Sequence, residues 1–209
     1  MLAIETIITF SLASSLIILA PGPDNLFVLS QSILHGKRAG LVAIIGICTG
    51  IVFQTTAVAF GLAMLFQSSA IAFSILKIVG AIYLVYLAWK ALTASVSSQN
   101  VEMVKNAVNL YELYIRSIFM NISNPKASMF FLAFLPQFVD VSAGAVAYQI
   151  FMLGGLVIVA TFFIFGMIVL LTFKLRDWVH RSPTVQMALN KVVGVMFLGF
   201  AFKLATSSR

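Results

Sequence analysis

Long apolar stretches dominate the chain and are separated by mostly short polar connections. Six of these stretches are long enough to cross a bilayer of about 30 Å, which takes roughly 20 helical residues. They are Thr6–Leu34, Gly40–Phe66, Ile71–Leu92, Tyr114–Val139, Tyr148–Phe173 and Ala188–Thr206. The one long polar connection, Thr93–Leu113, has the Ser, Gln, Asn and Glu content typical of a surface loop. The pattern predicts an all-α integral membrane bundle of about six transmembrane helices.

Two of these segments contain residues that interrupt a helix. The first holds Pro21-Gly22-Pro23 and the fourth holds Asn124-Pro125-Lys126. Proline donates no backbone hydrogen bond, and glycine allows unusual backbone angles. Backbone groups left unpaired at membrane depth are costly unless they are buried in protein or line a polar cavity. We therefore expect broken first and fourth helices, with Asn25 beginning a second half-helix whose amides favour a carboxylate.

The two halves of the chain resemble each other in sequence. The matched positions are Gly50, Thr56, Phe60 and Gly61 with Gly155, Thr161, Phe165 and Gly166; Lys77 and Gly80 with Lys191 and Gly194; and Pro23 with Pro125. Apolar helices also match by composition alone, but shared Gly, Lys and Pro positions favour a true repeat. Because each half has three spans, the second copy starts on the opposite side of the membrane, as in many secondary transporters. We expect one transmembrane domain, 1–209, with repeat one at about 1–94, a loop at about 95–112 and repeat two at about 113–209.

Composition and charge agree with a membrane location. The chain is 61% hydrophobic and 9% charged, whereas soluble domains carry about 25% charged residues. Its net charge of +7 is spread over the ends of apolar runs, so it does not indicate nucleic-acid binding. Nine basic residues lie at the first, third and fifth connections and three lie on the other side. The positive-inside rule therefore predicts cytoplasmic odd connections, with both termini outside.

Two charged residues at the breaks are the main candidates for chemistry. Superposing Pro23 and Pro125 places Asp24 and Lys126 at corresponding positions. An acid and a base at the repeat interface could bind the ammonium and carboxylate groups of a zwitterion. Burial favours a protonated Asp24, whereas a nearby lysine favours the charged form, so Asp24 is also a candidate proton carrier. The alternative is a buried structural pair in which Asp24 and Lys126 neutralise each other.

Other polar residues within the spans are weaker candidates. Gln54 and Asn121 are costly to bury without a partner, so each is a candidate for a cavity wall. Single threonines in membrane helices mostly bond their own backbone or a neighbour, and we interpret Thr161 as structural. Gly46 and Gly50 have a spacing that allows close helix packing. The predicted substrate-binding or coupling residues are Pro21, Gly22, Pro23, Asp24, Asn25, Gln54, Asn121, Asn124, Pro125 and Lys126, with no catalytic residue and no metal ligand.

These motifs together resemble the lysine/threonine exporter family (LysE/RhtB type). The likeness rests on Ala20–Asn25 (APGPDN), the pairs Gly36/Gly40 and Gly46/Gly50, Asn124–Ala127 (NPKA) and Phe134–Phe138 (FLPQF), in this order. It covers nearly the whole chain. The resemblance implies an exporter of amino acids in the bacterial inner membrane, driven by the proton gradient, without cofactor, nucleotide or covalent intermediate.

The functional hypothesis is export of small neutral or polar amino acids by proton antiport with alternating access. An ion or metal transporter is the alternative, although it would need clustered carboxylates, His or Cys in the spans. An enzyme is disfavoured because the chain has no His-Glu-x-x-His or Gly-x-Ser-x-Gly motif. The expected partners are an amino-acid substrate, protons and membrane lipid, but no nucleic acid. The small-residue faces permit a homodimer without requiring one.

Overall fold

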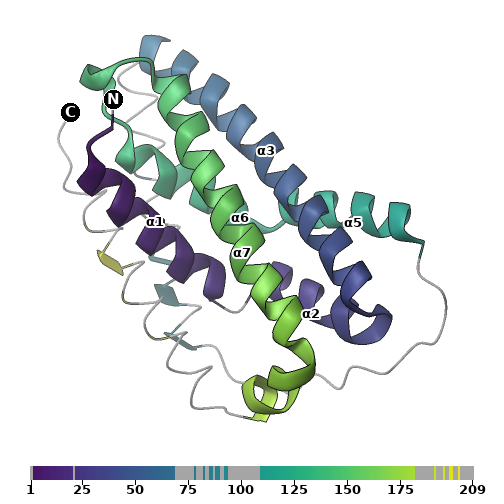
Figure 1. Cartoon of the computed structure of the whole chain (residues 1–209). Helices are drawn as coiled ribbons and strands as arrows, with labels where there is room; N and C mark the ends of the chain where they lie inside the picture. The colour runs from purple at the N-terminus through teal and green to yellow at the C-terminus, as the bar shows by residue number, and fades with distance from the viewer. Residues whose placement is uncertain are drawn as a thin grey trace.

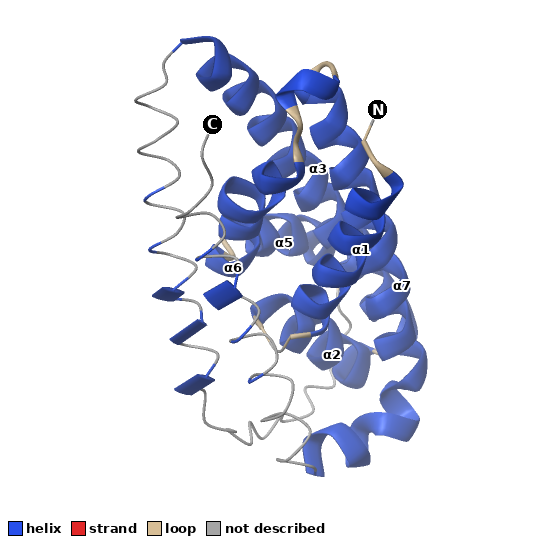
Figure 2. Cartoon of the chain, turned by 90° about the vertical axis from the view of Figure 1, so that its left-hand side faces the viewer, coloured by secondary structure: helices blue, strands red, loops and turns tan. Residues whose placement is uncertain are grey.

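The protein is helical wherever the structure, a computed structural model, describes it. The described residues are 2–20, 22–68 and 109–181, with scattered positions within 78–93 and 191–202. Across these residues the ribbon is built from helices and short loops, without strands (Figure 2). The α-helices are α1 Ile4–Leu19, α2 Pro23–His35, α3 Lys37–Ser68, α5 Leu110–Ile122, α6 Pro125–Met129 and α7 Val146–Arg181. The predicted all-α fold class is confirmed for this part of the chain.

Two long apolar helices form the centre of the described bundle. α3 and α7 run side by side in Figure 1 and contact each other along their lengths. Within them, Lys37–Gly61 and Val146–Leu171 are long and apolar enough to cross a membrane. These stretches cover most of the predicted second and fifth segments.

The predicted first segment is broken, as expected. α1 and α2 are bent by 58° relative to each other and together form a third candidate span. Gly22 caps α2 in an extended conformation and Pro23 is its first residue. The expectation that Asn25 begins this half-helix is therefore wrong by two residues, because proline suits the first helical position, where no amide partner is needed. Pro21 lies outside the described residues.

The predicted fourth segment is also broken. α5 ends at Ile122 and Asn124 caps α6, which starts at Pro125. α6 continues into the π-helix η1, Phe130–Phe134, and the 3-10 helix η2, Leu135–Phe138. The Leu135 amide bonds the Phe130 carbonyl five residues back, and Pro136, which follows it, has no amide to continue the ladder. The sequence reading did not predict this change of helix type.

The fourth segment begins earlier than its hydrophobicity indicates. α5 starts at Leu110, although we expected a loop through Leu113. The Asn109 side chain accepts hydrogen bonds from the amides of Tyr111 and Glu112, which stabilises the helix start. The remaining connection before α7 contains a short 3-10 turn, η3, Val141–Ala143.

The third and sixth predicted segments lie almost wholly outside the described residues. The predicted loop up to residue 108 also lies almost wholly outside the described residues, and Lys77 lies outside them. The match between the Lys77 and Lys191 stretches can therefore not be compared in the structure. The count of six helices, the domain limits and the inverted repeat therefore stay predictions.

Close packing of α3 against α5 positions the site. A Cβ added to Gly46 would lie 2.5 Å from the Ser117 Cβ, and one added to Gly50 would lie 2.7 Å from the Asn121 Oδ1. The predicted role of these glycines in helix packing is confirmed. Only glycine lets α5 approach so closely that Asn121 reaches the centre of the bundle.

Aromatic side chains join α1 to the irregular helix after α6. The Phe10 ring lies 6.1, 6.0 and 5.1 Å from the rings of Phe130, Phe134 and Phe138. All four rings are buried. This cluster packs the middle of α1 against the segment that follows the second break.

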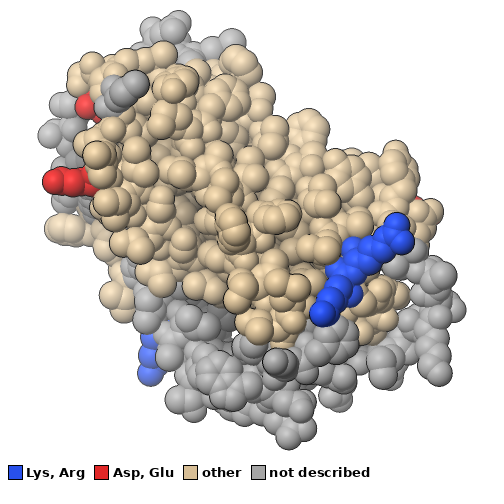
Figure 3. Space-filling view, viewed as in Figure 1, with Lys and Arg blue, Asp and Glu red and all other residues tan. Residues whose placement is uncertain are grey.

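The outer surface of the described bundle is strongly apolar. Phe163 is 68% exposed and Leu170 is 60% exposed on α7, and Phe60 is 60% exposed on α3. In Figure 3 the charged side chains of this face lie at its edges, and its middle carries none. Such a surface suits lipid rather than water.

Candidate functional site

Side chains replace the backbone hydrogen bonds that are lost at the break between α1 and α2. The Asn25 Nδ2 donates to the Ile18 carbonyl at 2.7 Å. The Lys126 Nζ donates to the Ala20 carbonyl at 2.7 Å. Carbonyl groups at a helix end need such partners when they are buried. Lys126 therefore connects the second break to the first.

The two breaks place an acid and a base at equivalent helical positions. Asp24 follows Pro23 in α2, and Lys126 follows Pro125 in α6. Both side chains line the same cavity. The predicted correspondence between the two prolines therefore agrees with their local geometry.

Asp24 is held by a short series of hydrogen bonds. The Asn121 Nδ2 donates to the Asp24 Oδ2 at 2.9 Å. The Gln54 Nε2 donates to the Asn121 backbone carbonyl at 2.9 Å and reaches the Asn121 Oδ1 at 3.3 Å. The other oxygen, Asp24 Oδ1, is buried and makes no hydrogen bond of ordinary geometry with the described residues, although the Asn124 amide also interacts with this carboxyl group. One oxygen of the carboxyl group is thus free to accept a bond from a ligand.

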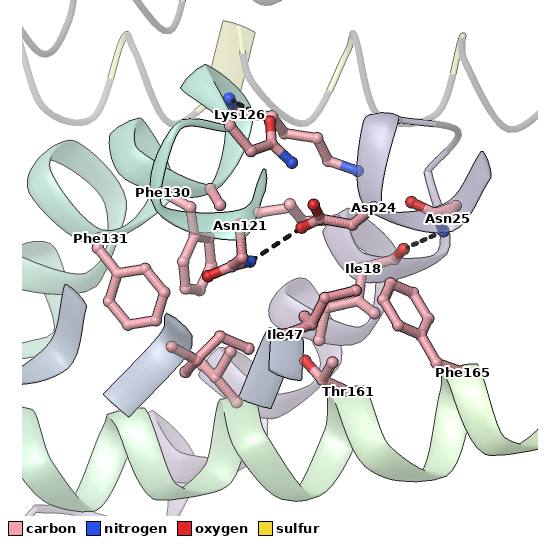
Figure 4. Close-up of a pocket in the computed structure, with 15 residues that line it drawn as sticks. Ile18, Asp24, Asn25, Ile47, Asn121, Lys126, Phe130, Phe131, Thr161 and Phe165 are labelled. Atoms are coloured by element: carbon pink, nitrogen blue, oxygen red, sulfur yellow. Dashed lines mark hydrogen bonds between the residues drawn. The ribbon is translucent and has the colours of Figure 1, made fainter. Parts of the chain in front are cut away.

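The cavity between the breaks has a volume of about 50 Å³. That volume is enough for a few water molecules or a small polar group, so the cavity must widen to admit a whole amino acid. Its polar lining residues at the breaks are Asp24, Asn25, Asn121, Asn124 and Lys126. Its apolar wall includes Ile47, Ile51, Phe130, Phe131, Val157 and Phe165 (Figure 4). The cavity therefore offers charged groups and amides at the breaks, where Ile17, Ile18 and Ala127 also lie, and an apolar surface on α3 and α7 opposite them (Figure 4).

The predicted site residues take different places around this cavity. The five polar lining residues at the breaks were all predicted. Gln54 lies behind Asn121 and does not line the cavity. Gly22 lies beside Lys126, since an added Cβ would come within 3.3 Å of its Nζ. Pro23 and Pro125 begin helices rather than contact the cavity, and Pro21 lies outside the described residues.

Thr161 and the apolar wall were not predicted as site residues. The Thr161 side chain is 2% exposed and its hydroxyl points from α7 into the cavity (Figure 4). Within the described part of the chain this hydroxyl makes no hydrogen bond, unlike Thr56, which bonds the Val52 carbonyl of its own helix. Its match to Thr56 in the repeat was the only signal available. The isoleucines and phenylalanines of the wall look like any others in an apolar sequence.

The site has the chemistry of a binding pocket for a small zwitterion. Asp24 can accept bonds from an ammonium group, and Lys126 together with the amides of Asn25 and Asn124 can bind a carboxylate. The apolar wall can cover a hydrocarbon side chain. Among the described residues no three His, Cys, Asp or Glu side chains come together as they would in a metal site.

Comparison with known proteins gives one family and a group of similar sequences. The family model described as LysE type translocator matches residues 15–208. The chain is 29% identical over 198 residues to the leucine efflux protein of Salmonella typhimurium (strain LT2), covering 95% of this chain and 93% of that protein. It is 30% identical over 199 residues to the leucine efflux protein of Klebsiella pneumoniae, covering 95% and 94%. No solved structure matches this chain.

Proposed function

This chain belongs to the LysE type translocator family, and on that premise we propose that it exports amino acids through the cavity between its two helix breaks. The family identifies it as a multi-pass membrane transporter and not an enzyme, which confirms the prediction from its motifs. The proposal adds the substrate class, the location of the substrate and the way in which it is moved.

The observation that supports the proposal most strongly is the division of the cavity into polar and apolar parts. A neutral amino acid has the same division, with an ammonium and a carboxylate group at one end and a side chain at the other. Asp24 has a buried oxygen that accepts no hydrogen bond of ordinary geometry from the described residues, which suits the ammonium group. Lys126 carries the positive charge that suits the carboxylate.

The substrate side chain should be small and neutral, and aliphatic in the first instance. The wall opposite the breaks is made of isoleucine, valine and phenylalanine side chains. Similar proteins are named leucine efflux proteins. A charged side chain would find no partner on this wall and would be costly to bury there. Thr161 is the one polar group on it and could accommodate a hydroxyl.

We infer alternating access from the contacts that hold the breaks. Lys126 donates to Ala20 across the gap between the two breaks. A substrate carboxylate would compete for this ammonium group, and its release would free the end of α1 to move. Asp24 would bind the substrate ammonium in one state and a proton in the other, which gives proton antiport. Both breaks belong to halves that we expect to be an inverted repeat, the usual arrangement for such a cycle.

Efflux from preloaded cells tests this function. Cells that express the protein and are loaded with labelled amino acids should release leucine and similar neutral residues faster than cells without it. Collapsing the proton gradient should abolish the difference. Asp24→Asn and Lys126→Met should each reduce efflux at least ten-fold, because loss of a charged partner in a buried site costs about 1.5–3 kcal/mol.

Membrane fractions must show equal amounts of folded protein for this comparison. Normal efflux by both variants would contradict the proposed site, and efflux of no amino acid by the unaltered protein would contradict the proposed substrate class. An ion or metal transporter stays the alternative function, but no observation on the described residues favours it.

A further inference from the structure

Gln54 is buried in α3 behind the cavity and bonds a residue that lines it. It is 8% exposed, and its Nε2 donates to the Asn121 backbone carbonyl at 2.9 Å. A side-chain amide is costly to place in an apolar bundle unless it is bonded. Its oxygen, Oε1, is buried without a partner, so the gain must come from the NH₂ group. That group contacts Asn121 alone among the described residues.

The hydrogen bonds that lead from Gln54 through Asn121 to Asp24 allow only one assignment of donors and acceptors. A backbone carbonyl accepts hydrogen bonds and cannot donate them, so Gln54 must present its NH₂ group to Asn121. The same NH₂ group reaches the Asn121 Oδ1 at 3.3 Å. This contact fixes the Asn121 amide with its oxygen toward Gln54 and its NH₂ toward Asp24. The Asn121 Nδ2 then donates to the Asp24 Oδ2 at 2.9 Å (Figure 4).

This fixed order decides which oxygen of Asp24 remains available. Oδ2 accepts a bond from Asn121, whereas Oδ1 is buried and, among the described residues, accepts no hydrogen bond of ordinary geometry, although the Asn124 amide also interacts with this carboxyl group. A buried acceptor without a partner is destabilising. The bond from Asn121 holds the carboxyl group by Oδ2. Because Asp24 lines the cavity, a ligand that enters there can supply the bond that Oδ1 lacks.

We propose that Gln54 and Asn121 are positioning residues that hold Asp24 by Oδ2 and reserve Oδ1 for the ammonium group of the substrate. This inference rests on the proposed function, since it assigns a ligand group to one atom of the same site. Gln54 does not touch the substrate and acts through Asn121. Gly50 makes this series of hydrogen bonds from Gln54 through Asn121 to Asp24 possible, because any larger residue would collide with the Asn121 side chain.

Removal of the Gln54 amide should weaken only the recognition of ammonium groups. Without the Gln54 amide, the Asn121 side-chain amide can rotate by half a turn and direct its Oδ1 toward Asp24. Oδ1 and the Asp24 carboxylate are both hydrogen-bond acceptors, so they repel each other. Asp24 would then lose its fixed orientation and part of the gain that a preorganised site provides. A ligand without an ammonium group makes no use of Oδ1, so its binding should not change.

Calorimetry on the purified full-length protein in detergent tests this difference. The ligands are leucine and 4-methylpentanoate, which has the same carboxylate and side chain but no ammonium group. In Gln54→Met and in Gln54→Leu the Kd for leucine should rise about ten-fold, the size of one hydrogen bond to a charged group, and the Kd for 4-methylpentanoate should stay the same. Gln137→Met is the matched control, because the Gln137 Nε2 donates to the Ala133 carbonyl within its own helical segment. Its affinities should equal those of the unaltered protein.

Two outcomes would overturn the positioning role while leaving the proposed function intact. Unchanged leucine affinity in both Gln54 variants would show that the hydrogen bonds from Gln54 through Asn121 do not orient Asp24. Equal losses for both ligands would show a general structural defect, which thermal unfolding of the variants would also report. If the unaltered protein bound neither ligand, the proposed substrate site itself would fail and the positioning role would fail with it.

Discussion

At the scale of single residues, the polar residues of the site can be recognised in the sequence and the apolar ones cannot. Asp24, Asn121 and Lys126 stand out because polar residues are rare in the apolar segments. Ile47 and Phe131 line the same cavity but cannot be told apart from the many similar residues that pack elsewhere or face lipid. The polar half of the site could therefore be predicted, whereas the apolar half required the three-dimensional arrangement.

Thr161 gives a test of substrate preference at this scale. Thr161→Val keeps the shape of the side chain and removes the hydroxyl that points into the cavity. Competition by threonine against efflux of labelled leucine should weaken about three- to ten-fold, the size of one ordinary hydrogen bond, and leucine efflux itself should be unchanged. Thr56→Val is the control, because this hydroxyl bonds its own helix. Undiminished competition by threonine would show that Thr161 does not contact the substrate side chain.

At the scale of helices, the breaks were predictable because proline and glycine act locally. Pro23 and Pro125 each begin a helix after an interruption, whatever surrounds them. The start of α5 at Leu110 depends on a cap by Asn109, and the helix after α6 changes to a π-helix just before Pro136. The pattern of hydrophobic residues indicates neither the Asn109 cap nor the π-helix. The predicted loop was therefore too long, and the change of helix type was not predicted.

Packing of α3 against α5 leads to a stability prediction. Gly46→Ala would place a Cβ 2.6 Å from the Tyr114 backbone oxygen, and backbone cannot move aside as a side chain can. We expect a loss of about 1–3 kcal/mol, typical of overpacking, measured as reduced thermal stability in detergent. Gly61→Ala on the same helix should be neutral or slightly stabilising, because none of the described residues lies within 4 Å of its added Cβ and alanine favours helix. Equal stability of the two variants would contradict the close packing.

At the scale of the whole molecule, the described helices form an apolar body with an internal polar site. Exposed apolar side chains surround it, and the charged residues of the face in Figure 3 lie at its edges. Asp24 and Lys126 are exceptions to this distribution and are found at the breaks. An intramembrane charge is costly and usually functional. The orientation of the termini, the inner-membrane location, a homodimer and the inverted repeat stay predictions.

The most direct test of the central claim is to fill the cavity and measure which substrates still bind. Ala127 lines the cavity, so Ala127→Leu should take up part of the space that a large substrate needs. Ala57→Leu on the exposed face of α3 is the control. In purified protein, Ala127→Leu should lower leucine affinity more than ten-fold and spare glycine and alanine, whereas Ala57→Leu should change none of them. Full leucine binding by a folded Ala127→Leu protein would show that the substrate site lies elsewhere.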